Sequence, residues 1–153
     1  QVGIVPVRKD GCSNLFDQIK GVCGNTVTPV GPTSMQAFVS HLYSCVLQRN
    51  GSDAEVNGWS VMFTSNKSTV SAMYTTFFTS AEYKLRNSSD KDYATSLYKC
   101  ILFRTPTDAE ASFQAGALGF LTRNALRMNF LRSAEFQLSM QSNLNFLSSY
   151  GVE

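Results

Sequence analysis

One segment of this chain occurs twice, and the repetition limits the folds that the chain can adopt. Residues 42–55 read LYSCVLQRNGSDAE, and residues 97–110 read LYKCILFRTPTDAE. Identical residues recur at one constant offset, as in the pairs Leu42/Leu97, Cys45/Cys100, Arg49/Arg104, Asp53/Asp108 and Glu55/Glu110. A repeat of about 50 residues indicates two copies of one supersecondary unit that bury their apolar faces against each other.

A shorter match follows each copy. Residues 79–83 (TSAEY) correspond to residues 132–136 (RSAEF), so the second unit carries a small deletion somewhere between the two matched segments. Repeated units usually form scaffolds or binding surfaces, because each copy contacts only its neighbours. A catalytic site instead needs chemistry that one copy has and the other lacks. The repeat therefore favours a structural or binding role.

Apolar residues recur three and four positions apart between polar turns, which predicts three helices in each unit. Ser52 with Glu55, and Thr107 with Glu110, are capping-box patterns at the start of each unit's second helix. The sequence shows no sustained period-two alternation of the kind that strands require. We therefore expect an all-α fold made of two three-helix units, with a short N-terminal helix and a C-terminal capping helix.

Other polar residues set the expected helix starts and the domain plan. Thr33 with Gln36 is a third capping-box pattern, and Ser68 and Thr122 are the expected caps of the third helices. Within one compact domain we expect four segments, which are an N-terminal extension (1–32), two repeat units (33–89 and 90–136) and a C-terminal helix (137–153). That last helix is expected to cover the open end of the array.

The four cysteines, an even number, favour an oxidising compartment and hence an extracellular or periplasmic location. Cys12 and Cys23 flank a short segment that a disulfide can close. Cys45 and Cys100 occupy equivalent repeat positions, which can meet across a pseudo-two-fold axis. We expect the pairs Cys12–Cys23 and Cys45–Cys100. The alternatives are the other pairings, or free thiols buried in a reduced core.

Composition argues against two classes of partner. The net charge of +2 and the dispersed Lys and Arg residues do not suit nucleic-acid binding, and no apolar run is long enough to insert into a membrane. The chain begins at Gln1, so we expect a mature or trimmed product. Asn50, Asn66 and Asn87 open Asn-x-Ser/Thr sequons, which are either glycan sites of a secreted eukaryotic protein or ordinary turn residues.

Three residues are candidates for ligand binding. Arg49 and Arg104 follow predicted helices, where a cation stabilises the last carbonyls and can pair with the Glu of the SAE segment. The alternative is that each forms a fork for a carboxylate or phosphate ligand. Trp59, the single tryptophan, is expected in the core. Its alternative is a partly exposed ring that stacks on a sugar or inserts into a partner.

Other chemistry has weaker support. His41 precedes Cys45 by one helical turn, which suggests a thiolate nucleophile, or a zinc site completed by Cys100. An orienting residue and a fourth ligand are lacking, so neither is expected. The acidic segments 53–55 and 108–110 suit helix N-termini better than a calcium loop. We expect no catalytic residue, metal or cofactor.

The repeated pattern, LY-x-x-(V/I)L-x-R-x-x-x-DAE followed by SAE-(Y/F), resembles the bacterial domain-of-unknown-function family "four-two-one-four" over residues 37–136. That family often has Gly before the arginine, where this chain has Gln48 and Phe103. The resemblance implies a helical unit similar to phycobilisome linker domains, in a secreted or surface-layer-associated bacterial protein. It implies a binding or assembly role and supplies no catalytic residues.

Three functions follow in order of expectation. The first is a non-enzymatic, extracytoplasmic module, alone or within a larger protein or oligomer, that binds a protein or glycan at a bacterial cell surface. The second is a carbohydrate- or peptidoglycan-binding module that uses Trp59 and surface aromatic residues. The third is an enzyme that uses Cys45 and His41.

Overall fold

The computed structural model describes residues 32, 34–140 and 151, and in this part of the chain every regular element is helical. The all-α prediction is confirmed. The first unit contains α2 (Met35–His41), the π-helical turn η1 (Leu42–Val46), α3 (Asp53–Asn66), α4 (Val70–Phe78) and α5 (Ala81–Leu85). The second contains α6 (Asp90–Ile101), α7 (Asp108–Ala117), α8 (Arg123–Leu131) and α9 (Ala134–Met140).

The positions of the helix starts show where the second unit is shorter than the first. α2 with η1 corresponds to α6, and α3 corresponds to α7 at an offset of 55 positions, from Asp53 to Asp108. α4 corresponds to α8 at an offset of only 53, from Val70 to Arg123. The deletion therefore falls between the starts of α7 and α8, where α7 has 10 residues and α3 has 14.

The prediction of three helices per unit was wrong, because each SAE segment starts a short fourth helix. Ser80 caps α5, its hydroxyl accepting from the Tyr83 amide at 3.1 Å. Ser133 makes the same contact with the Phe136 amide at the start of α9. We placed the boundary between the second unit and the C-terminal helix at residues 136 and 137. α9 runs across this boundary to Met140.

Side-chain caps start the other helices. The two predicted capping boxes are present at the starts of α3 and α7, and Thr122 caps α8 as predicted. Two predicted caps are displaced by one residue. Thr69 rather than Ser68 caps α4, and Ser34 rather than Thr33 caps α2, because each of these hydroxyls accepts from the amide three positions on. Thr33 itself lies outside the described residues.

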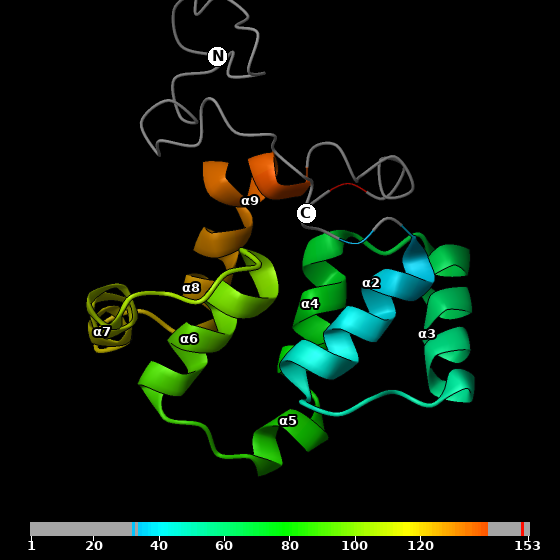
Figure 1. The fold of residues 1–153 in the computed structure, drawn as a ribbon, viewed down its shortest axis with the longest axis horizontal. Helices are drawn as coiled ribbons and strands as arrows, with labels where there is room; N and C mark the ends of the chain where they lie inside the picture. The colour runs from blue at the N-terminus through cyan, green and yellow to red at the C-terminus, as the bar shows by residue number, and fades with distance from the viewer. Residues whose placement is uncertain (1–31, 33, 141–150, 152–153) are drawn as a thin grey trace, which may run out of the picture.

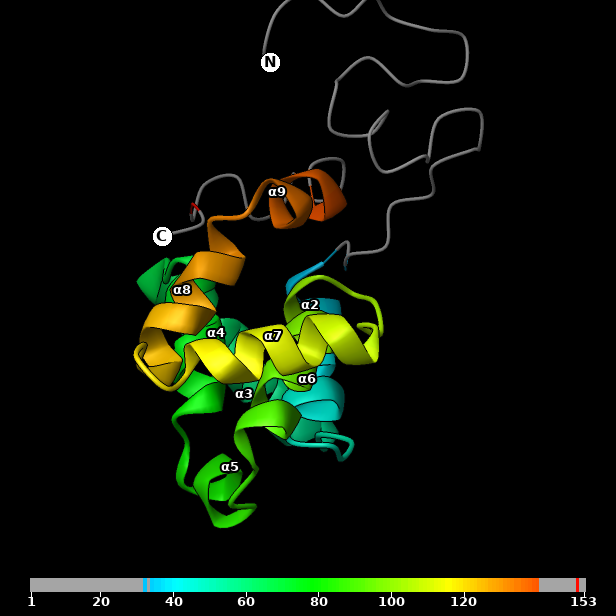
Figure 2. The ribbon, with the colours of Figure 1, turned by 90° about the vertical axis from the view of Figure 1, so that its left-hand side faces the viewer.

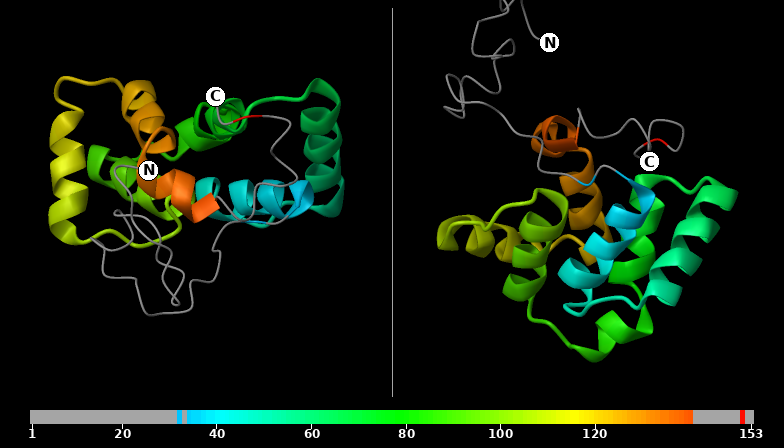
Figure 3. Two further views of the ribbon diagram at one scale, coloured as in Figure 1. Left: turned by 90° about the horizontal axis from the view of Figure 1, so that it is seen from above. Right: turned by 45° about the vertical axis from the view of Figure 1, so that its right-hand side comes forward.

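Equivalent helices occupy opposite parts of the molecule (Figure 1). α2, α4, α6 and α8 lie in the middle, with α3 along one side and α7 along the other, and with α5 and α9 at opposite ends. The side view and the view from above agree on the outer position of α7 (Figures 2 and 3). The two units therefore place their equivalent outer helices on opposite sides of a shared centre.

Aromatic side chains fill the centre. Phe38 and Tyr74 pack edge to face within the first unit, with ring centroids 5.4 Å apart, and Tyr98 and Phe130 do so in the second at 4.9 Å. The largest fully buried apolar side chains come from both units: Phe38, Leu42, Phe63, Met73, Tyr74, Tyr93, Leu97, Ile101, Leu126, Leu131 and Phe136. One continuous core therefore holds the two units together.

A buried arginine also crosses the boundary between the units. Arg127 of α8 is 2% exposed and donates to the Tyr93 hydroxyl at 3.0 Å and to the Thr75 hydroxyl of the first unit at 3.3 Å. Burial raises the pKa of Tyr93, so its hydroxyl remains protonated and neutral at physiological pH. These contacts fix the relative position of α4, α6 and α8.

The two units are also joined covalently. Cys45 of η1 and Cys100 of α6 form a disulfide, with their Cα atoms 5.5 Å apart, so this predicted pair is confirmed. The predicted Cys12–Cys23 pair, the predicted short N-terminal helix and most of the predicted C-terminal helix lie outside the described residues.

Candidate functional site

Each repeated arginine forms a cluster with two glutamates of its own unit. The Arg49 guanidinium donates to Glu82 at 2.6 and 3.0 Å and to Glu55 at 3.0 and 2.9 Å. Arg104 donates to Glu135 at 2.6 and 3.3 Å and to Glu110 at 2.9 and 2.8 Å. The DAE and SAE segments recur in the sequence because each supplies one of these carboxylates.

The clusters leave little capacity for a ligand. Hydrogen bonds from Arg104 and from the Thr107 amide lower the pKa of Glu110 to about 2, and Arg49 acts in the same way on Glu55. Each guanidinium also lies over a tyrosine ring at 4.9 Å. Because each guanidinium makes four hydrogen bonds to carboxylates, and Arg49 makes a fifth to the Asn50 carbonyl, Arg49 and Arg104 connect helix ends in this structure rather than offering an open anion site.

Trp59 belongs to the edge of the core. Its ring is half-buried and stacks on Phe63 at 5.5 Å, with Phe77 at 5.8 Å. This is the position that the apolar stripe of α3 predicted. The stacked Phe63 ring covers one face of the indole.

His41 and Cys45 do not form a nucleophile pair. Cys45 is in the disulfide, and the His41 Nε2 atom lies 2.7 Å from the Cys100 carbonyl oxygen. Since that oxygen can only accept, Nε2 carries the proton. In the described part of the chain, no three His, Cys, Asp or Glu residues are arranged to hold a metal ion.

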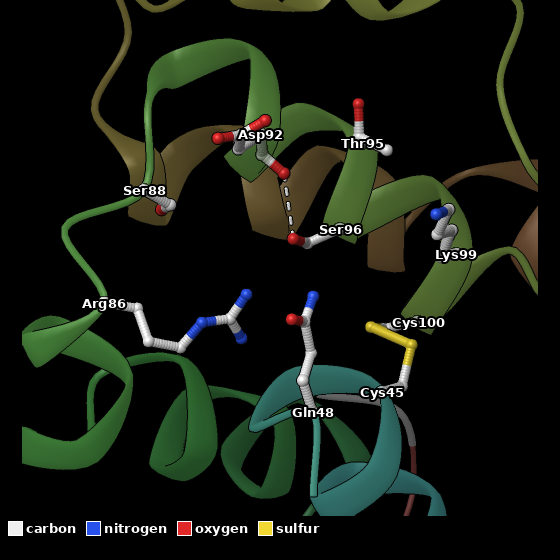
Figure 4. A pocket seen from close by; sticks show the side chains of 9 residues that line it. All are labelled: Cys45, Gln48, Arg86, Ser88, Asp92, Thr95, Ser96, Lys99 and Cys100. Carbon is white, nitrogen blue, oxygen red and sulfur yellow. Dashed lines mark hydrogen bonds between the residues drawn. A yellow bond between two sulfur atoms is a disulfide. The ribbon is translucent and has the colours of Figure 1, made fainter.

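A polar pocket lies beside the disulfide, between the two units. Its volume is about 330 Å³, within the lower range for small-molecule sites. One wall is a stripe of α6 at helical spacing, and the other comes from the ends of η1 and α5 (Figure 4). The lining residues are Cys45, Gln48, Arg86, Ser88, Asp92, Thr95, Ser96, Lys99 and Cys100.

The charged groups of the pocket are two cations and one carboxylate. Arg86 donates through Nη1 to the Val46 carbonyl at 2.6 Å and lies over the Tyr83 ring at 5.5 Å. These contacts hold its guanidinium in place, directed into the pocket in Figure 4. Lys99 and the Asp92 carboxylate make no ion pair with any described residue. The pocket therefore has a net positive charge.

The repeat shows why this side of the disulfide is open. Gln48 and Ser96 both line the pocket, and their repeat equivalents are Phe103 and His41. Phe103 and His41 are in ring contact, with centroids 4.9 Å apart. Two large rings thus meet at one pair of equivalent positions, whereas an amide and a hydroxyl leave space at the other.

A second surface feature lies on α7. Phe113 on α7 and Phe120 shortly after it are 76% and 81% exposed. The α3 residue equivalent to Phe113 is Gly58, which has no atom within 4 Å of an added Cβ. The equivalent position therefore carries glycine in the first unit and an exposed phenylalanine in the second.

Sequence reasoning missed both features. The stripe of Asp92, Thr95, Ser96 and Lys99 has the composition of an ordinary solvated helix face. Phe113 and Phe120 follow the apolar spacing of a core-facing helix. A comparison of the two units position by position would have detected both, because their equivalents differ in size or polarity.

Comparison with known proteins supports the repeat. The family described as "Domain of unknown function (DUF4214)" matches residues 28–87 and again residues 74–140. No curated protein and no solved structure matches the chain. Among the described residues, no helix has the length and apolarity that crossing a bilayer requires. The two matches together span most of the sequence, and the chain therefore belongs to the DUF4214 family, of which it contains two copies in tandem.

Proposed function

We propose that this chain is a non-enzymatic helical repeat module that binds a protein or a glycan outside the cytoplasm, at a bacterial cell surface. The exposed pair Phe113 and Phe120 carries the proposal. Large aromatic side chains that are more than three-quarters exposed cost solubility and are typical of contact sites for another macromolecule. The disulfide between the units suits an oxidising compartment.

The shape of the exposed surface suits a protein partner. Phe113 lies on α7 and Phe120 lies in the turn that follows it, while Leu118, between the two rings, and Leu121, next to Phe120, pack against the core. The packed leucines anchor this segment, so the two rings are presented on a fixed backbone. A rigid aromatic pair loses little conformational entropy on binding.

Site-specific photo-cross-linking tests the proposal. A benzophenone amino acid is placed at Phe113 in the full-length protein on cells that produce it, and at Gly58 as the matched position of the first unit. We expect one discrete cross-linked product from position 113, lost when Phe120 is changed to Ser, and none from position 58. Protease added to the intact cells should degrade the module. Equal cross-linking from both positions, or protection from the protease, would contradict the proposal.

A further inference from the structure

We propose that the pocket beside the Cys45–Cys100 disulfide binds a sugar acid, that is, a monosaccharide-sized ligand with a carboxylate and several hydroxyl groups. The inference rests on the proposed binding role and names the chemistry of a glycan ligand. It uses the junction between the units and none of the α7 surface. The site is therefore separable from protein docking by experiment.

The charge of the pocket selects an anion. Arg86 is held by the Val46 carbonyl and the Tyr83 ring, and its remaining N–H groups have no partner among the described residues. Lys99 lies across the pocket on α6 and is likewise unpaired within the described structure. A carboxylate between a guanidinium and an ammonium group gains charge-assisted hydrogen bonds from both sides.

The uncharged polar side chains of the pocket favour a ligand that carries hydroxyl groups. Gln48 supplies an amide that both donates and accepts, and Thr95 supplies a hydroxyl from the α6 wall. The Ser96 hydroxyl donates to the Asp92 carbonyl at 2.9 Å and can accept from a ligand hydroxyl. Asp92 can accept from a ligand hydroxyl. In Figure 4 the Arg86 guanidinium and the Gln48 amide point into the same space below Ser96. No aromatic ring is among the described residues that line the pocket, so a neutral sugar held by stacking is disfavoured.

Gln48 lies in the chain reversal that both units share. Gln48 has a φ of 55°, in the left-handed region that favours glycine. Its amide nevertheless lines the pocket. Phe103 has the same backbone conformation at the equivalent position, so what is particular to Gln48 is that its side chain is an amide that lines the pocket.

The two units differ at the positions of α6 that line the pocket. Asp92, Thr95 and Lys99 are the equivalents of Ala37, Ser40 and Ser44 in the first unit. The first unit carries no charge at these positions. Lys99, Asp92 and the open space therefore all lie on the same side of the disulfide.

Isothermal titration of the purified full-length chain tests the site. The probes are D-glucuronate and D-galacturonate, with D-glucose and inorganic sulfate as controls. We expect one sugar acid or both to bind at one site per chain, glucose not to bind, and sulfate to bind more weakly. Binding of glucose as tight as that of the acids would overturn the role of the cations. Sulfate binding as tight as that of the acids would overturn the role of the hydroxyl-binding groups.

Variants locate the binding. Lys99→Gln removes one charge-assisted contact and should weaken binding roughly tenfold, whereas Lys84→Gln, a matched exposed lysine on α5, should leave it unchanged. The double variant Gln48→Phe with Ser96→His recreates the ring pair of the other side. It should remain helical by circular dichroism and bind no ligand. Unchanged binding in this folded variant, or no binding by the parent chain, would overturn the site, while Phe113→Ser should have no effect on it.

Discussion

At the scale of single residues, one backbone carbonyl organises the centre of the molecule. The Cys100 carbonyl oxygen accepts from the His41 ring at 2.7 Å and from the Tyr74 hydroxyl at 2.7 Å. Burial lowers the pKa of His41, and the hydrogen bond to Cys100 opposes this shift only in part. The folded state therefore holds a neutral imidazole.

The neutral imidazole predicts a pH-dependent stability. The unfolded chain takes up a proton near the ordinary pKa of 6.5, and the folded chain does so only at lower pH. Stability is therefore full above about pH 6.5 and decreases as the pH falls toward the folded-state pKa. Urea unfolding between about pH 7 and about pH 5 measures this decrease.

The control for this prediction is His41→Gln. His41 is the only histidine in the sequence, so the variant should lose most of the pH dependence in that interval. The glutamates paired with Arg49 and Arg104 act in a separate interval, below about 4.5, because their pKa values are lowered. A parent chain whose stability stays flat from pH 7 to pH 5 would show that His41 is not buried in its neutral form.

At the scale of helices, both repeat units reverse the chain through a residue in the left-handed conformation. Gln48 follows η1 with a φ of 55°, and Phe103 follows α6 with a φ of 58°. After each, the arginine amide bonds back to a tyrosine carbonyl at 3.3 Å, which brings the guanidinium to its two glutamates. Left-handed backbone at a non-glycine residue costs roughly 1–2 kcal/mol.

Gln48→Gly should therefore stabilise the fold by about 0.5–1 kcal/mol, after the added flexibility of the unfolded chain is subtracted. The same variant should weaken sugar-acid binding, because the amide is lost. The urea midpoint and titration of glucuronate measure the two effects.

Lys67→Gly is the matched control for this prediction. Lys67 ends α3 with a φ of 50° and lies away from the pocket-lining residues. This variant should also be stabilised and should bind as the parent does. A loss of stability in Gln48→Gly alongside a gain in Lys67→Gly would mean that the glutamine side chain contributes more to folding than its backbone costs.

Sequence patterns predicted most of the helices because helix starts are set locally. The capping boxes of α3 and α7 and the cap of α8 follow from side chains within three positions of the helix start. The short helices α5 and α9 were missed, because five to seven residues contain too few apolar positions to show a period. Their caps, Ser80 and Ser133, were the available signal.

At the scale of the whole molecule, the candidate site depends on how the units meet. The pocket combines the ends of η1 and α5 with one face of α6, and no single segment of sequence contains its lining. The Arg–Glu clusters were half predicted, because the pairing of each arginine with the SAE glutamate was expected and its pairing with the DAE glutamate was not. Each pairing joins residues from separate helices, so the contacts could be seen only once the positions of those helices were known.

The two units share a scaffold and differ where they could bind. The clusters, the caps and the disulfide positions are common to both. The second unit alone has the polar stripe on its first helix and the exposed Phe113 on its second. Duplication thus supplies stability from both copies, while one copy carries the differences on which the proposed function rests.

The central claim is that two equivalent units meet with Cys45 against Cys100, and non-reducing peptide mapping tests it most directly. The unreduced full-length protein is digested, and the disulfide-linked peptides are identified by mass spectrometry before and after reduction. We predict a peptide from η1 joined to one from α6 through Cys45 and Cys100. A Cys45 or Cys100 joined to Cys12 or Cys23, or labelled as a free thiol without reduction, would contradict this packing of the units and remove the pocket with it.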